Sequence, residues 1–334
     1  MKGRTMTILI TGGAGYIGSH MSWLMQDNNQ DAVILDDLSN GNINLVPRNM
    51  RLVVGDIADE PTVERILRDH QISAIIHFAA KIVVPESVAV PLDYYRDNTS
   101  KSRTLIALAV KHGVKHFIFS STAAVYGDTQ DPLVTEESEK NPASPYGRSK
   151  LMVEWMLQDA AQAHGLTYAV LRYFNVAGAD PQGRTGQSTR NATHLIKVAC
   201  EAALGRRPEL LVYGTDYPTE DGSCVRDYIH VADLVDAHYQ ALNYLKQGYP
   251  NTVINCGYGR GASVFDVIET VKRVSGYDFP VRLVDKRAGD PTSLVANTSK
   301  LRSTLDWVPR NDNLATLVRH AFEWEEKLGQ SSSA

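Results

Sequence analysis

Cysteine is scarce in this sequence, and long apolar runs are missing. The three cysteines, Cys200, Cys224 and Cys256, are an odd number without a CxxC pair, which argues against a disulfide-built fold and against a metal site. No stretch approaches the ~20 apolar residues that cross a bilayer, and the first residues lack the apolar core of a secretory signal. We therefore expect a cytoplasmic protein with reduced thiols, no bound metal and no membrane partner.

A strong excess of charge is also absent. The 34 Lys and Arg residues against 38 Asp and Glu residues give a net charge of -4, and the isoelectric point is about 6.2. This balance excludes a global attraction to nucleic acid or to anionic membranes. With 43% hydrophobic and 22% charged residues, the composition is that of a globular protein. Any phosphate-bearing ligand must therefore be held by local groups.

The first half of the chain alternates short apolar runs with amphipathic segments. Near-continuous apolar runs are typical of parallel strands buried on both faces, and a 3.6-residue period between them indicates covering helices. With right-handed crossovers, this order predicts an α/β domain with a doubly wound parallel sheet of Rossmann type. Strands are expected at 7–11, 32–36, 52–55, 74–78, 116–120 and 167–172, and helices at 17–26, 60–69, 99–112 and 146–164.

The second half of the chain has a different pattern of residues. Residues 178–191 are rich in glycine and polar side chains and are expected to form a long loop, whereas residues 329–334 are expected to be a frayed tail. We interpret residues 1–176 as a dinucleotide-binding domain and residues 177–330 as a smaller mixed α/β substrate domain, interleaved at the boundary. In the second part, helices are expected at 194–204, 231–245, 264–274 and 313–327, and strands at 210–213, 253–255 and 281–284.

A glycine turn follows the first expected strand. Gly12, Gly15 and Gly18 have a GxxGxxG spacing, which lets backbone amides at a helix N-terminus approach a pyrophosphate. The second strand ends at Asp36, 18 residues after Gly18, where a carboxylate can bond ribose hydroxyls. Because Asp36 and Asp37 would repel a 2′-phosphate, the pattern favours NAD over NADP. The alternative is a structural turn beside a solvated acidic pair.

Tyr146 and Lys150 lie four residues apart at the start of a long expected helix, with Ser144 as its N-cap. They therefore share one helix face. A nearby ammonium and the positive helix end both favour a phenolate, so we expect a lowered pKa for Tyr146 and a general base that takes a proton from a sugar hydroxyl. The alternative is an exposed helix face, which is the usual context of a YxxxK pair.

Thr122 ends the strand expected before this helix. Hydroxyls at the carboxyl end of a strand lie where doubly wound sheets bind ligands. Thr122 is therefore a candidate to bond the reacting oxygen together with Tyr146. The alternative for Ser120, Ser121 and Thr122 is a turn held by local side-chain bonds.

In combination, the glycine turn, the Ser-Ser-Thr strand end and the YxxxK pair resemble the signature of the short-chain dehydrogenase/reductase family. The extended branch of that family has this length and a C-terminal substrate domain. Within the branch, nearly the whole chain resembles the UDP-glucose/UDP-galactose 4-epimerases. The segments that carry this resemblance are DDLSN at 36–40, HFAA at 77–80, LRYFN at 171–175, YPTEDG at 217–222 and VRDYIHV at 225–231.

The resemblance implies two sets of site residues. Arg226 and Arg287, which belong to the second set below, also suit a diphosphate on chemical grounds, because a planar guanidinium group can donate two parallel hydrogen bonds to a phosphate. The first set would line the NAD site: Gly12, Gly15, Tyr16, Ile17, Gly18, Asp36, Asn40, Asp56, Ile57, Phe78, Ala79, Asn98, Tyr146, Lys150 and Phe174. The second set would line the UDP-sugar site: Thr122, Asn175, Leu195, Leu211, Tyr213, Arg226, Arg287 and Asp290.

The sequence departs from the resemblance at three places. A lysine that follows the Phe-Ala segment in the family falls on Ile82, with Lys81 one position early. His194 stands where many relatives have an asparagine that contacts the nucleotide sugar. Leu294 stands where relatives have a tyrosine or a smaller residue beside the sugar, so this position bears on which sugar is accepted.

The residues after Thr122 narrow the reaction. Related dehydratases carry an Asp-Glu pair there and related decarboxylases a Glu, whereas this chain has Ala123 and Ala124, which cannot transfer protons. The resemblance then implies NAD-dependent 4-epimerisation of a UDP-hexose, with catalytic Tyr146, Lys150 and Thr122. Alternatives are another UDP-sugar (an N-acetylhexosamine, a uronate or a pentose), a nucleotide-sugar reductase or dehydrogenase, or a non-catalytic NAD-binding sensor.

The resemblance also implies a homodimer formed through two helices of the first domain. The candidate segments are 99–112 and 146–164, which carry apolar residues on more than one face. Such stripes are more often plain core, so this expectation depends on which faces the fold leaves uncovered.

Overall fold

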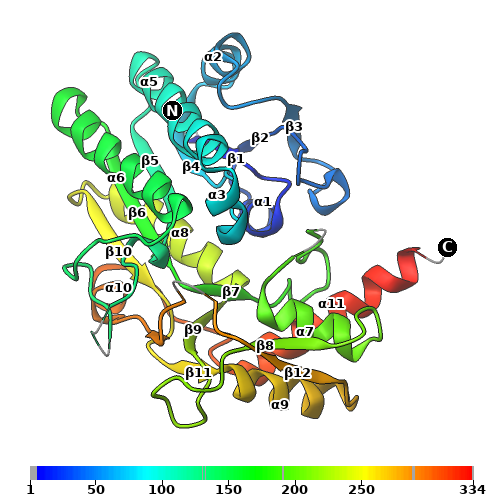
Figure 1. Cartoon of the computed structure of the whole chain (residues 1–334). Coiled ribbons are helices and arrows are strands. Elements are labelled where there is room, and N and C mark those ends of the chain that lie inside the picture. Colours follow the sequence, from blue (N-terminus) through cyan, green and yellow to red (C-terminus); the bar gives the residue numbers. More distant parts are fainter. Residues whose placement is uncertain (1–5, 130, 132, 190–191, 288–289, 333–334) are drawn as a thin grey trace.

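The computed structural model describes residues 6–129, 131, 133–189, 192–287 and 290–332. Within them, seven parallel strands form one sheet in the order β10-β6-β5-β4-β1-β2-β3, and the strand order reverses between β1 and β4. This is the predicted doubly wound architecture (Figure 1). The strands are β1 (Thr7–Thr11), β2 (Ala32–Asp36), β3 (Arg51–Val54), β4 (Ile72–His77), β5 (His116–Thr122), β6 (Thr167–Tyr173) and β10 (Thr252–Cys256).

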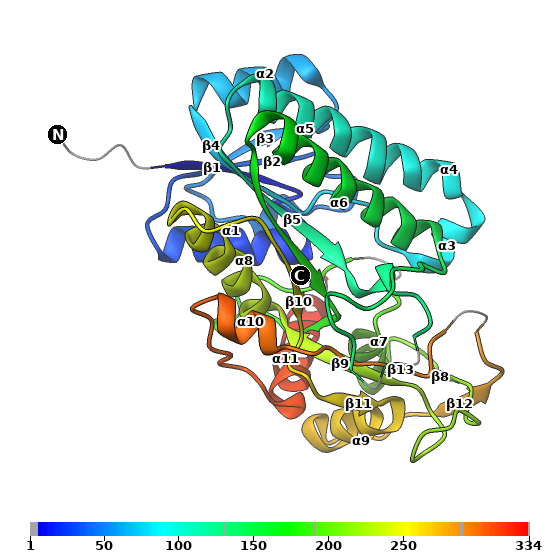
Figure 2. The same ribbon diagram turned by 90° about the vertical axis from the view of Figure 1, so that its left-hand side faces the viewer.

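Helices cover both faces of this sheet. Because side chains alternate along a strand, Ile8 and Ile10 of β1 pack into one apolar cluster and Leu9 into the other. In Figure 2, α1 and α8 lie on one side of the sheet and α2, α5 and α6 on the other. These helices are α1 (Tyr16–Asp27), α2 (Glu60–Asp69), α5 (Lys101–Lys111), α6 (Pro145–His164) and α8 (Val231–Lys246).

The remaining elements form a C-terminal part below the carboxyl edge of the sheet (Figure 1). Strand β9 (Val225–His230) pairs with β7 (Asn175–Ala177), β11 (Gly261–Ser263) and β13 (Ser293–Leu294), and β8 (Leu210–Tyr213) pairs with β12 (Val281–Val284). Its helices are α7 (Leu195–Ala203), α9 (Val264–Ser275), α10 (Ser299–Thr304) and α11 (Leu314–Ser332). One apolar cluster runs from Ile8 of β1 to Val318 of α11, so the two parts share a core.

Several expected elements differ from the observed ones. The strand expected at 253–255 was assigned to the C-terminal part, but β10 pairs with β6 in the large sheet, because its side chains are as fully buried as those of its neighbour. The helix expected to begin at residue 99 is preceded by α3 (Val84–Ala89), α4 (Pro91–Tyr94) and a π-helix (Tyr95–Ser100). Of the tail expected to be frayed at 329–334, residues 329–332 continue α11, and residues 333–334 lie outside the described residues.

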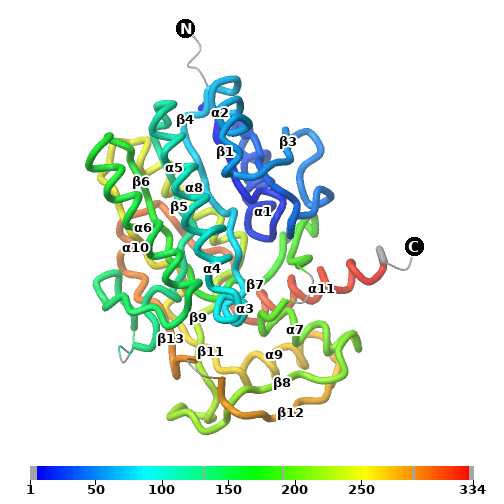
Figure 3. The backbone as a smooth tube through the Cα atoms, turned by 45° about the horizontal axis from the view of Figure 1, so that its top comes forward, coloured from blue at the N-terminus to red at the C-terminus, as the bar shows by residue number. Residues whose placement is uncertain are grey.

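A segment after β7, residues 178–187, fastens the C-terminal part to α1. The Tyr16 hydroxyl donates to the Gly178 carbonyl at 2.6 Å, and the hydroxyls of Ser19 and Thr185 are 2.7 Å apart. The guanidinium of Arg184 donates to Asp27 at 2.8 and 2.9 Å. Figure 3 shows this green segment running beneath α1. We call residues 178–187 the strap.

No helix in the described ranges is long and apolar enough to cross a membrane.

Candidate active site

The carboxyl edge of the large sheet gathers the predicted site residues. Successive strands end at the glycine turn after β1, at Asp36 on β2, at Asp56 after β3, at Phe78 after β4, at Thr122 on β5 and at Phe174 after β6. In an open parallel sheet, this edge at the point of strand-order reversal is where ligands bind. Ile17, Asn40, Ile57 and Ala79 lie in the same turns or in the first turn of α1.

The glycine turn is sterically closed to side chains. Gly12 has a φ of 68°, and a Cβ there would lie 2.6 Å from the Ala79 amide nitrogen. A Cβ on Gly18 would lie 2.1 Å from the Gly12 carbonyl oxygen. Gly15 is the N-cap of α1. The turn therefore brings bare backbone to the N-terminus of α1, which suits a pyrophosphate.

Asp36 is tied to this turn. Its carboxylate accepts hydrogen bonds from the amides of Ala14 at 2.8 Å and Leu38 at 2.9 Å. Burial raises the pKa of Asp36, and these amide bonds oppose the rise. The carboxylate is thereby fixed beside the glycine turn, where a ribose would follow the pyrophosphate.

Thr122, Tyr146 and Lys150 lie together in a dry environment, with 8%, 6% and 2% of their surfaces exposed. The Ser144 hydroxyl caps α6 by accepting from the Gly147 amide at 3.2 Å. The Thr122 hydroxyl lies near the Tyr146 phenol. The Lys150 ammonium donates to the Ser120 carbonyl at 3.0 Å and lies 5.0 Å from the centre of the Phe119 ring.

The expected lowering of the Tyr146 pKa is wrong for this arrangement. Burial raises the pKa of the phenol, and Thr122 opposes the rise. Burial also lowers the pKa of Lys150, to about 7. Desolvation disfavours the charged form of both groups and exceeds the effect of the helix end. The dry surroundings therefore favour a neutral phenol at Tyr146.

Other residues expected in the cofactor site have protein partners. The Asn98 amide accepts from the Lys81 amide at 2.8 Å and donates to the Lys81 carbonyl at 3.0 Å, so it clamps the segment after Phe78. The Lys101 ammonium donates to Asp56 at 2.5 Å. The Lys81 ammonium lies near Glu86, at 3.5 Å, and the neighbouring Ile82 is 42% exposed.

The residues expected to hold the UDP-sugar lie on the C-terminal part. Arg226 on β9 forms an ion pair with Asp290 at 3.4 Å, and the Arg287 guanidinium lies 3.5 Å above the centre of the Tyr213 ring at the end of β8. Leu211 lies on the same strand. In β13, Leu294 is in register with Arg226.

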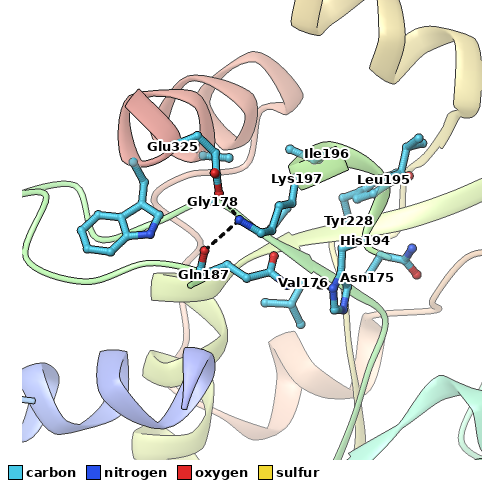
Figure 4. A pocket seen from close by; sticks show the side chains of 13 residues that line it. Asn175, Val176, Gly178, Gln187, His194, Leu195, Ile196, Lys197, Tyr228 and Glu325 are labelled. Carbon is cyan, nitrogen blue, oxygen red and sulfur yellow. Dashed lines mark hydrogen bonds and ion pairs between the residues drawn. The ribbon is translucent and has the colours of Figure 1, made fainter. Parts of the chain in front are cut away.

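Asn175, His194 and Leu195 meet at a small cavity that Tyr228 also lines. Figure 4 shows His194 next to Asn175. The Gln187 amide lies 2.8 Å from the His194 Nδ1 atom, and burial lowers the pKa of this imidazole. The neutral ring leaves its other nitrogen available as a hydrogen-bond donor.

A buried ion pair between Arg172 and Glu154 lies behind Lys150. Neither residue was expected in the site from the sequence. The signal that could have found them is the spacing of four between Lys150 and Glu154, together with an arginine inside an otherwise apolar strand.

A doubly wound sheet, a glycine turn with an acidic partner, and a buried Thr-Tyr-Lys group define a dinucleotide-dependent protein of the short-chain dehydrogenase/reductase class. Residues 8–257 match the family described as NAD dependent epimerase/dehydratase. The chain belongs to this family, and its cofactor is NAD.

Relatives cover the chain almost completely. It is 54% identical to a UDP-glucose 4-epimerase of Azospirillum brasilense over 97% of this chain and 93% of that one. Among solved structures, a UDP-glucose 4-epimerase from Brucella ovis in complex with NAD is 40% identical, with a TM-score of 0.93 over 96% of this chain and 98% of that one. The UDP-Glc/GlcNAc 4-epimerase of Campylobacter jejuni is 45% identical, with a TM-score of 0.85 over 96% and 99%.

Proposed function

We propose that this protein is a UDP-hexose 4-epimerase, which interconverts UDP-galactose and UDP-glucose through a transient 4-keto sugar. The observation that carries the proposal is the buried group of Thr122, Tyr146 and Lys150 at the edge where NAD binds. The next two residues along the chain are Ala123 and Ala124, so the site offers one proton-transfer group and nothing for elimination or decarboxylation.

The residues have distinct tasks in this reaction. Bound NAD would take a hydride from C4 of the sugar and return it to the opposite face. Tyr146, with Thr122 near it, removes the proton of the 4-hydroxyl and later returns it. Lys150 supplies the positive charge that stabilises the phenolate. Burial of all three side chains keeps water away from the keto sugar.

Substrate anchoring falls to the C-terminal part. The guanidinium groups of Arg226 and Arg287 suit the two phosphates of UDP. Asn175 on β7 and Leu195 on α7 line a small cavity in the same part of the molecule. The 4-keto sugar must present both faces during one turnover. A firm hold on the nucleotide and a loose hold on the sugar allow it to turn, because binding energy is then placed on the part that does not react.

The preferred sugar depends on Leu294. Leu294 packs with Phe174, Ala123 and Tyr126 in one apolar cluster and is in register with Arg226. A leucine is smaller than a tyrosine, so room for an N-acetyl group at this position supports activity on UDP-N-acetylhexosamines as well. One relative is named as an epimerase of both UDP-Glc and UDP-GlcNAc.

We further propose that the protein is a homodimer. Trp155 on α6 is 55% exposed, and Val88 on α3 and Leu92 on α4, two helices that contact α6, are 64% and 78% exposed. Exposed apolar side chains on neighbouring helices fit a symmetric interface between two copies. Light scattering would test this: we expect a dimer mass for the wild type and a monomer mass for Trp155→Glu.

A cytoplasmic location is part of the same proposal. Cys200, Cys224 and Cys256 are all free and buried, as expected in a reducing compartment. Cell fractionation tests it, and recovery in an exported fraction would contradict it.

The activity is tested by incubating the purified protein with UDP-galactose without added NAD and following the anomeric protons by NMR. We expect UDP-glucose to appear, and to appear no longer with Tyr146→Phe. Tyr258→Phe, which removes one hydroxyl from another buried tyrosine, is the matched control and should keep activity. Absence of any product with wild type would reject the glucose/galactose assignment.

A further inference from the structure

A buried polar network lies directly behind the reaction centre. The Glu154 carboxylate accepts from the Arg172 guanidinium at 2.5 and 3.0 Å and from the Ser121 hydroxyl at 2.5 Å. Arg172 also donates to the Tyr126 hydroxyl at 2.9 Å, which in turn donates to the Asn255 side chain at 2.6 Å. None of these five residues is more than 6% exposed.

The network and Lys150 are held by the same piece of β5. The Ser120 carbonyl accepts from Lys150, and the hydroxyl of the next residue, Ser121, donates to Glu154. Strand β6 places Arg172 in register with Ser121. Glu154 itself lies four residues after Lys150 on α6 and therefore on the same face of that helix.

A buried carboxylate without a partner would take up a proton, because desolvation raises its pKa. The bidentate Arg172 contact and the Ser121 hydroxyl instead satisfy Glu154 as an anion. The network therefore maintains a fixed negative charge one helical turn from an ammonium that is itself taken out of water.

We infer that Glu154, clamped by Arg172 and Ser121, is a positioning residue that keeps Lys150 in its charged form for the reaction at Tyr146. This inference rests on the proposed role of Tyr146 and Lys150 in epimerisation. It assigns to the ion pair an electrostatic task in addition to its place in the core.

The surroundings of Lys150 support this assignment. Glu154 is the charge that raises the pKa of Lys150 against the effect of burial. Burial and the charge of Lys150 both lower the pKa of His77 on β4, to about 3, so this imidazole is neutral. The other titratable groups that face the centre are Tyr146 on α6, Tyr94 on α4 with Glu86 of α3 behind it, and Tyr173 and Arg172 on β6. The buried Glu136 bonds Asn255 at the far end of the network, whereas Glu154 is tied to strand β5, the strand that also binds Lys150.

The test reads the charge of Lys150 directly. NMR of the lysine side-chain signals in the full-length protein, with the Lys150 signal assigned by Lys150→Arg, gives its titration midpoint without any turnover. We expect the midpoint to fall by about one pH unit in Glu154→Gln. The amide keeps the shape of the carboxylate but removes its charge and leaves Arg172 uncompensated, and both changes disfavour the ammonium. The alkaline limb of the kcat profile should move down with it, lowering kcat about tenfold above both midpoints.

Two further variants separate this role from a contribution to folding alone. Glu154→Leu combined with Arg172→Met leaves no unpaired buried charge, so it should fold and still lower the midpoint, by less than Glu154→Gln. Lys197→Met with Glu325→Leu removes a similarly buried pair between α7 and α11 and should leave the Lys150 midpoint unchanged.

An unmoved Lys150 midpoint in Glu154→Gln overturns the inference, and so does an equal shift in the Lys197/Glu325 control. If Glu154→Gln fails to fold, an unmoved midpoint in the double variant overturns it as well. Absence of epimerase activity in the wild-type protein would reject the proposed function. The titration of Lys150 could still be measured in that case, so failure of the proposed function and failure of this inference are distinguishable.

Discussion

The two ends of the proposed site have different environments: a reaction end with Tyr146 and Lys150, and an anchoring end with Arg226 and Arg287. Thr122, Tyr146 and Lys150 are almost fully buried, whereas the Arg287 side chain is exposed and Arg226 is only partly buried, near Asp290. Desolvation adjusts proton affinities where bonds change, and hydrated arginines grip an anion without a large cost of burial. Chemistry and binding are thus assigned to separate environments, and variants at each end should change different kinetic constants.

The largest effect is expected at the reaction end. Lys150→Met should lower kcat about 1,000-fold, because the proposed phenolate of Tyr146 loses the positive charge of Lys150 and general base catalysis is typically worth ~10²–10⁴. The KM for the UDP-sugar should change less than about threefold. Steady-state kinetics of UDP-galactose conversion measures both. A rise in KM with kcat retained would show that the two ends are not separate.

The next effect is expected at the anchoring end. Arg226→Met and Arg287→Met should each raise KM and the Kd for UDP about 10- to 100-fold, since a hydrogen bond to a charged group contributes about 1.5–3 kcal/mol. Calorimetric titration with UDP measures the Kd. Arg282→Met is the matched control, because this exposed arginine pairs with Glu209 on the surface. Large falls in kcat in the two anchor variants would break the comparison.

Lowering the pH should destabilise the fold through a buried histidine. Burial lowers the pKa of His77 from 6.5 to about 3, while its nitrogens bond the hydroxyls of Thr11 and Ser102. The unfolded chain therefore takes up this proton first, and stability falls as the pH drops below 6.5 towards the folded value. At pH 5, 1.5 units below, the loss is about 2 kcal/mol for this residue.

Urea unfolding at pH 7 and pH 5 measures this loss. His77→Asn should lower stability at pH 7 but show a smaller fall between the two values. His164→Asn, at the exposed end of α6, should keep the wild-type fall. An unchanged pH dependence in His77→Asn would contradict the expectation.

The smallest effect is expected where the two ends meet. Leu294→Tyr should lower the ratio of kcat/KM for UDP-N-acetylgalactosamine to that for UDP-galactose about tenfold, because added bulk in a pocket is worth roughly 1–3 kcal/mol. Competition between the two substrates in one NMR experiment measures the ratio directly. Leu283→Tyr, on the exposed face of β12, is the control. Equal ratios in wild type and Leu294→Tyr would remove Leu294 from the determinants of specificity.

The sequence predicted the N-terminal half of the fold well because its information is local. Each strand of the large sheet between Thr7 and Tyr173 is an apolar run flanked by turn residues, and each covering helix has its own period. In β9, by contrast, Val225–His230 alternates charged, polar and apolar residues, and it becomes a strand through partners distant in sequence. The placement of β10 beside β6 is also non-local, since about 80 residues separate them.

The candidate site shows the same limit. Motifs that lie within a few residues, such as the glycine turn or Tyr146 and Lys150, could be singled out from the sequence, and the fold brings them to one edge of the sheet. The direction of the Tyr146 pKa shift could not be predicted in this way. It depends on how much water the folded chain removes from the phenol, whereas the sequence shows only the helix end and the nearby ammonium. The Arg172–Glu154 network brings together β5, β6, α6 and β10, so no local pattern reveals it.

The strap adds a kinetic consequence. Residues 178–187 are hydrogen-bonded to Tyr16, Ser19 and Asp27 on α1, the helix proposed to hold the dinucleotide. If the dinucleotide lies at this helix, these bonds oppose any separation of α1 from the C-terminal part that its release would involve. We therefore expect one NAD molecule to serve a long succession of turnovers. In that case the interconversion is insulated from the redox balance of the surrounding cell, and its direction depends on the two sugars alone.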